Sequence, residues 1–158
     1  MQQEFTTKAR KKEFDSLFKE KIVPFLNDFG FTRCTTTSKA MFKDLGNGLS
    51  VFIFFEFKTF GSGFYDINIT YFDTEIGNVH DGQYLAMAQI RRPTIKGNSM
   101  GEMNSSVDLW ISKIQSEIIP FIESHSTHKA ILKSNHFYMP YGKENQFKEL
   151  LIRKSQDG

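Results

Sequence analysis

Two carboxylates and one imidazole are the side chains of this chain best suited to acid–base chemistry. Glu56 lies in the largely apolar run LSVFIFFEFK and Asp66 in the alternating run GFYDINITYFD, and antiparallel pairing of these runs places the carboxylates directly opposite each other. Mutual repulsion in such a pair favours a retained proton on one carboxylate, which suits general acid–base catalysis. His80, in the loop NVHDGQY, would complete a pocket. The simpler alternative is a surface pair neutralised by Lys43 or Lys58, with His80 in a solvated turn.

The same strand face mixes aromatic and polar groups that suit binding. It carries Phe52, Phe54, Glu56, Asp66, Asn68 and Thr70, flanked by Met41 and Lys43. If helices cover only the other face, the rings anchor a partner while the carboxylates and the amide set its orientation. If later helices fold over it, the face is a second core. Both alternatives stay open.

Positive charge is concentrated in two short clusters. One comprises Lys8, Arg10, Lys11 and Lys12, and the other comprises Arg91 and Arg92 beside Lys96. The formal net charge is only +2, so no global field attracts phosphate backbones, and a solvated helix start and a loop are the expected roles. RNA binding through Arg91, Arg92, Phe52 and Phe54 is the weakest alternative, because neighbouring carboxylates repel phosphate. Nucleic acid is therefore not the expected partner.

Histidine and cysteine allow two further site hypotheses. His125, His128 and His136 are numerous enough for zinc, but their spacing matches no metal signature, and structural or surface roles are expected. Cys34 with His80 or His125 as base would make a nucleophile. Cys34 shares strand parity with Ala40 and Phe42, which predicts an inward-facing, inert thiol. With no phosphate-cradling loop and no dinucleotide fingerprint, no metal and no cofactor are expected.

An amphipathic helix is predicted before the strands. Its apolar residues recur at three- and four-residue spacing up to Gly30, namely Phe14, Leu17, Phe18, Ile22, Phe25, Leu26 and Phe29. Pro24 lacks the N–H that would bond to Glu20, so a kink or a second helix start is expected there.

A three-stranded meander follows. Asn47-Gly48 predicts a two-residue turn pairing Gly46 with Leu49, and therefore Phe42 with Ile53 and Ala40 with Phe55. The run 49–58 is then predicted to pair with the run 64–73, with Phe57 opposite Tyr65 and Val51 opposite Tyr71.

The remaining elements are less regular. Residues 84–90 form a fourth strand or a helix, 73–83 a loop, and 96–106 a mobile loop. Ser105 and Asp108 predict the start of a helix whose apolar stripe comprises Leu109, Trp110, Ile114, Ile118, Phe121 and Ile122. Two more helices are expected from Thr127 and from Lys143.

These elements predict an α+β fold: a twisted antiparallel β-meander of three to four or more strands, with helices packed mainly on one face. One domain of residues 1–158 is expected, with an ordered core of about 12–152 and frayed ends at 1–8 and 153–158. The single cysteine excludes an internal disulfide, and neither a signal peptide nor a membrane span is recognisable, so a cytoplasmic location is expected.

Three segments carry a family resemblance. Asp28-Phe29-Gly30-Phe31 ends a helix, FYDINITYFD forms a strand, and a helix runs from Asp108-Leu109-Trp110 to Ile119-Pro120-Phe121. Over residues 14–132 the chain resembles the bacterial domain-of-unknown-function family 4304. The resemblance implies an α+β fold and a bacterial origin, and it implies no activity.

The absence of catalytic motifs favours a small non-catalytic binding module acting through the aromatic and polar strand face, with an immunity-like inhibitor as one version. A protein partner or a homodimer is expected, and a small-molecule ligand is not excluded. The alternative is a small hydrolase or transferase with Glu56, Asp66 and His80 around a pocket.

Overall fold

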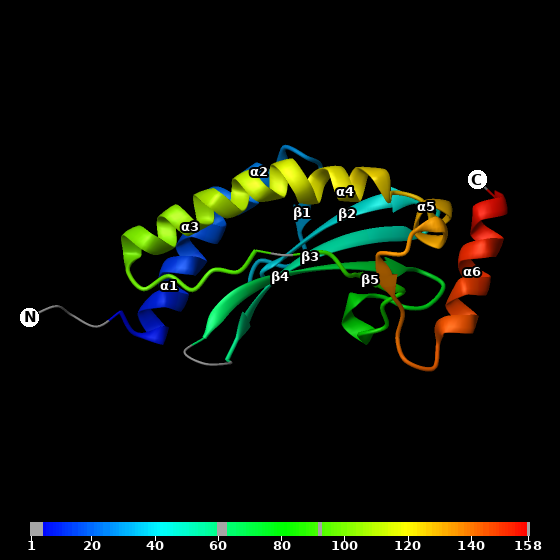
Figure 1. Ribbon diagram of the computed structural model, residues 1–158, viewed down its shortest axis with the longest axis horizontal. Coiled ribbons are helices and arrows are strands. Elements are labelled where there is room, and N and C mark those ends of the chain that lie inside the picture. The colour runs from blue at the N-terminus through cyan, green and yellow to red at the C-terminus, as the bar shows by residue number, and fades with distance from the viewer. Residues whose placement is uncertain (1–4, 60–62, 92, 158) are drawn as a thin grey trace, which may run out of the picture.

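The computed structural model describes residues 5–59, 63–91 and 93–157. Within them, six antiparallel strands form one sheet in the order β1-β2-β3-β4-β5-β6, and helices lie over one of its faces (Figure 1). The predicted α+β class, with an antiparallel meander and helices mainly on one face, is therefore confirmed. Six strands agree with the predicted three to four or more, and two of the six contain only two residues.

The long strands form the centre of the sheet. β3 (Leu49–Lys58) and β4 (Phe64–Asp73) pair along their whole length, and β2 (Ala40–Gly46) lies on the other side of β3. The outer strands are β1 (Thr32–Arg33), β5 (Ala86–Ala88) and β6 (Phe137–Tyr138). β5 shows that residues 84–90 contain a strand, whereas β6 was not predicted because two residues are too few for a periodic signal.

Two long helical segments have the same order of elements: an α-helix, a π-turn and a second α-helix. The first comprises α1 (Thr7–Leu17), the π-turn η1 (Phe18–Ile22) and α2 (Val23–Asn27). The second comprises α3 (Met100–Lys113), the π-turn η3 (Ile114–Ile118) and α4 (Ile119–Ser124). In each, the wider turn precedes a proline, where the i→i−4 ladder must break because proline has no N–H. The second helix start expected at Pro24 is thus present.

The C-terminal part adds α5 (His128–Lys133) and α6 (Glu144–Asp157), and a 3₁₀ turn, η2 (Val79–Asp81), lies between β4 and β5. Two expectations need correction here. Residues 96–106 are not all loop, since α3 begins at Met100 with Ser99 as its N-cap. The tail after residue 152 is not irregular, because α6 continues to Asp157.

The predicted register between β2 and β3 is wrong by one residue. Gly46 pairs with Leu49 as expected, but Asp44 pairs with Ser50 and Phe42 with Phe52. The extra residue is Leu45, and Gly46, with a φ of 93°, adopts the left-handed conformation that a bulge of this kind uses. Ala40 and Phe42 consequently share a face with Phe52 and Phe54, whereas Met41 and Lys43 face the helices.

The main core lies between the sheet and the helices. The β3–β4 register agrees with the prediction, including Phe57 opposite Tyr65 and Val51 opposite Tyr71. Trp110 of α3 is buried there against Phe14 of α1 and Phe55 of β3. Leu109 departs from the predicted apolar stripe, because 59% of it is exposed.

Candidate functional site

The sheet face away from the helices, called the open face below, carries a cluster of four phenylalanines. Ring centroids lie 5.2 Å apart for Phe42 and Phe52, 5.6 Å for Phe52 and Phe54, and 4.9 Å for Phe52 and Phe72. This aromatic cluster alternates with the core-facing residues because successive strand side chains point to opposite faces. Phe52 and Phe54 were predicted here; Phe42 joins them through the bulge.

No α-helix among the described residues contributes to this cluster. Its other members are Ala40, Cys34, Val79 and Tyr84, which come from strands, η2 and loops. Figure 1 shows α1–α4 gathered over the opposite face of the sheet. Phe52 and Phe72 are covered by neighbouring rings, whereas Phe42 and Phe54 are only half-buried. Of the two alternatives, the structure therefore favours an open face over a second, helix-covered core.

A polar strip continues the open face toward β6. Asn68 accepts a hydrogen bond from the Thr70 hydroxyl and donates one to the Met87 sulfur. The Tyr138 hydroxyl also donates to this sulfur, and 39% of Tyr138 is exposed. The strip therefore places an amide and a phenol beside the rings.

Glu56 and Asp66 are directly opposite each other, as predicted. Glu56 is bonded to the Lys58 ammonium at 2.7 Å, and Asp66 accepts a hydrogen bond from the Ile67 N–H. His80 lies in η2, whose Val79 packs against the cluster formed by Ala40, Phe52 and Phe72. From Phe52 to Glu56 the strand extends about 13 Å. The structure therefore does not gather the predicted catalytic trio into one pocket.

The predicted arginine site is only partly described. Arg91 is exposed and lines a shallow depression with Pro93, Thr94, Lys113 and Glu117. Arg92 lies outside the described residues.

Cys34 lies at the border of the aromatic cluster and is half-buried. Its N–H bonds to the Ala40 carbonyl, so the predicted parity with Ala40 is correct. The predicted inward orientation of Cys34 is wrong. The bulge at Leu45 places Ala40 on the open face, and Cys34 lies on the same face as Ala40.

The three histidines do not converge. His125 hydrogen-bonds to Ser134 and to the Phe121 carbonyl, and its ring is 6.3 Å from that of His136. His128 instead bonds to Asp73. Within the described part of the chain, no three His, Cys, Asp or Glu side chains are grouped as metal ligands.

A buried charged cluster that the sequence did not lead us to predict joins four segments that are distant in the chain. The Asp73 carboxylate accepts hydrogen bonds from His128 Nε2 at 2.6 Å and from Lys154 Nζ at 2.9 and 3.0 Å. Lys154 also donates to the Asn47 carbonyl at 2.9 Å. These bonds connect the end of β4, the β2–β3 turn, α5 and α6.

The hydrogen bonds keep Asp73 ionised. Burial alone would raise its pKa, but the bonds from His128, the Glu75 N–H and Lys154 together lower the pKa below the ordinary value. Asp73 is completely buried and Lys154 nearly so, so their charges compensate each other out of water.

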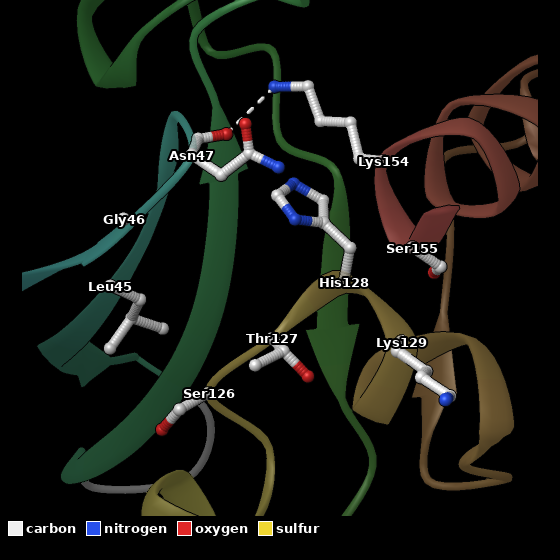
Figure 2. Close-up of a pocket in the computed structure, with 9 residues that line it drawn as sticks. All are labelled: Leu45, Gly46, Asn47, Ser126, Thr127, His128, Lys129, Lys154 and Ser155. Carbon is white, nitrogen blue, oxygen red and sulfur yellow. Dashed lines mark hydrogen bonds between the residues drawn. The ribbon is translucent and has the colours of Figure 1, made fainter. Parts of the chain in front are cut away.

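A cleft of about 350 Å³ adjoins this cluster. Figure 2 shows the His128 ring and the Lys154 side chain directed toward Asn47 from different elements. An imidazole oriented by a carboxylate can act as a general base, but the nearby hydroxyls are engaged. Ser126 donates to the Ile122 carbonyl, and Thr127 accepts from the Ala130 N–H. What the bonds of His128 and Lys154 to Asp73 do show is that α5 and α6 are joined to the end of β4.

The sequence did contain signals for this cluster. Asp73 continues the inward-facing series Tyr65, Ile67, Ile69 and Tyr71, so alternation places a carboxylate in the core. Lys154 lies three, four and seven residues after Leu151, Leu150 and Phe147 of the apolar stripe of α6. A buried acid and a buried base at core positions predict each other, because neither is stable alone.

Comparison with protein-family models, curated proteins and solved structures finds no match for this chain. The resemblance to family 4304 therefore stays a prediction. No helix among the described residues is both long and apolar enough to cross a membrane.

Proposed function

We propose that this chain is a non-catalytic binding module whose open face docks a protein partner. The observation that carries the proposal is the aromatic cluster, whose rings pack against one another on a sheet face to which no described α-helix contributes. Aromatic side chains with few rotatable bonds are typical anchors of protein interfaces.

The charges of the open face indicate the chemistry of the partner. Among the described residues of β2, β3 and β4, the strand register places the acidic Asp44, Glu56 and Asp66 on this face together with one basic residue, Lys58, which is paired with Glu56. An apolar partner surface bordered by Lys or Arg complements this arrangement.

A second copy of the chain fits less well than a different protein. A symmetric dimer would bring the same acidic side chains of two copies toward each other. Like charges facing across an interface cost free energy, so a homodimer is the disfavoured alternative.

Inhibition of a basic partner by covering its surface, as an immunity protein does, is one version of the proposal and is an analogy. A bacterial and cytoplasmic setting and membership of family 4304 belong to the same proposal. The single Cys34 is compatible with a reducing compartment.

Affinity capture with matched variants tests the proposal. Tagged wild-type protein, Phe54→Ala and Asp66→Lys are compared as baits in lysate of the source organism. Leu109→Ala is the matched control, because it removes an exposed apolar side chain on α3, away from the open face. We expect one stoichiometric protein with the wild type and with Leu109→Ala, and at least about 30-fold less with Phe54→Ala.

Two outcomes would overturn the proposal. Equal recovery by Phe54→Ala and wild type, with both folded by circular dichroism, would show that the open face does not bind the protein. A shift of the purified chain to a concentration-dependent dimer that Phe54→Ala abolishes would assign the face to a second copy.

A further inference from the structure

Three lysines of the basic cluster found in the sequence form a stripe on α1, and Lys19 extends it into η1. At about 100° per residue, Lys8, Lys11 and Lys12 fall on one side of α1 together with Asp15, and Lys19 continues this side. Glu13 and Glu20 fall outside this stripe. All four lysines are exposed, whereas Arg10 turns inward and donates to the Gly63 carbonyl at 2.9 Å.

Lys11 and Lys19 of the stripe line a groove, called the α1 groove below. Two adjoining depressions, of about 290 and about 180 Å³, share Asp15 and Lys39. Phe55, Phe57 and Tyr65 form the floor of one, and Arg33, Thr36 and Thr37 line the other. The groove is therefore an extended track rather than a closed pocket.

Positive charge in the α1 groove exceeds the carboxylates available to it. Asp15 is bonded to Lys39 at 2.6 Å. Among the described residues, no carboxylate lies within ion-pair distance of Lys8, Lys11, Lys12 or Lys19. The low net charge of the chain thus hides a separation of charge, with carboxylates on the open face and lysines along α1.

The side chains around the lysines indicate which kind of polyanion suits the α1 groove. Of the rings that line the groove, Phe18, Phe55 and Tyr65 are buried and only Phe57 is half-buried, whereas the open face carries two half-buried rings, Phe42 and Phe54. An acidic protein would need an apolar centre for its interface, and a membrane would need side chains that insert into it. A lysine track without such anchors suits phosphates, which it contacts as point charges.

We infer that the α1 groove binds the phosphate backbone of a single-stranded nucleic acid without reading its sequence. The lysines that line the groove follow the helix over about 12 Å from Lys11 to Lys19. Phe57 is half-buried beneath the Lys11 ammonium, 4.4 Å from its ring centroid, and offers one face on which a base stacks after Lys11 moves to a phosphate.

Fluorescence anisotropy with fluorescein-labelled oligo(dT) and oligo(U) of about ten nucleotides tests this inference. NaCl is varied from about 20 to about 200 mM. For about four neutralised phosphates, log K is expected to fall against log salt with a slope of about −3. The double variant Lys11→Glu/Lys19→Glu is expected to bind at least about 10-fold more weakly, with a slope shallower by about 1.4.

The matched control is Lys129→Glu/Lys148→Glu, which changes the net charge equally at two exposed lysines of α5 and α6. It should alter the affinity by less than about 2-fold. If both double variants weakened oligonucleotide binding equally, the loss of affinity would follow from the net charge of the chain and not from the α1 groove. That result would overturn the inference. So would undetectable binding at about 20 mM NaCl, or tighter binding of a duplex, a poly-glutamate peptide or anionic lipid vesicles.

Discussion

The buried charge of Lys154 holds separate elements of the fold together. Its ammonium donates to both Asp73 oxygens and to the Asn47 carbonyl, so it links α6 to β4 and to the β2–β3 turn. Only 6% of its side chain is exposed. A buried ion pair of this kind gains little net stability over apolar residues, but breaking it leaves an uncompensated charge out of water.

We therefore expect Lys154→Met to lower the free energy of unfolding by about 3–5 kcal/mol, since Asp73 stays buried without its cation. Lys148→Met, at an exposed position of the same helix, should change it by less than about 0.5 kcal/mol. Urea unfolding measures both. Similar small effects of the two substitutions would show that Asp73 does not depend on Lys154.

Asp73 also makes stability depend on pH in a defined direction. Its folded-state pKa lies below the ordinary value of 3.8, so its contribution is complete above that value and is lost as pH falls through the folded-state pKa. Asp73→Asn removes this contribution. Between pH 7 and pH 2, the free energy of unfolding should fall more steeply for the wild type than for Asp73→Asn. Parallel pH profiles would contradict this.

The β2–β3 hairpin shows why the face on which a strand residue lies was harder to predict than which strands pair. The turn Asn47-Gly48 and the β3–β4 register follow from turn chemistry and strict alternation, and both were correct. The bulge at Leu45 was not predictable, because it depends on Leu45 packing into the main core. One extra residue exchanged the faces of Phe42 and Met41, which changed the composition of the candidate site.

The predicted start of α3 was wrong for a different reason. Ser99 and Glu102 form a capping pair that predicts the start of α3, but the glycines and polar residues around them indicated a loop. The later pair Ser105 and Asp108 was preferred because an apolar stripe followed it. Both serines precede a carboxylate by three residues, so only the packing of Met103 and Val107 decides between them.

The β2–β3 turn also permits a test of local packing. Gly48 has a φ of 80°, and a Cβ there would lie 2.6 Å from Thr74 Oγ1 and 3.1 Å from Lys154 Nζ. Gly142 has a φ of 81° with no atom within 4 Å of the same position. Gly142→Ala should cost about 1–2 kcal/mol from backbone conformation alone.

Gly48→Ala should cost at least about 1 kcal/mol more, because it also displaces the partners of Asp73. Thermal and urea unfolding of the two variants compare these costs. Equal destabilisation would mean that the turn is not packed against the charged cluster.

The two faces of the sheet differ in the side chains they carry. The helix-covered face contains the main core, while the other face carries the aromatic cluster bordered by Asp44, Glu56 and Asp66. The sequence predicted the rings and carboxylates of the open face but could not show whether helices cover it. That depends on where α5 and α6 pack, and the buried bonds of Lys154 and His128 fix them at the main core.

Site-specific photo-crosslinking from Cys34 tests the central proposal most directly. Cys34 is the only cysteine of the chain and lies at the border of the aromatic cluster, so a benzophenone maleimide reports contacts of the open face alone. In lysate of the source organism, we predict one crosslinked partner protein that disappears with Phe54→Ala and persists with Leu109→Ala. Crosslinking to a second copy of the chain, or a partner that survives Phe54→Ala unchanged, would contradict the proposal.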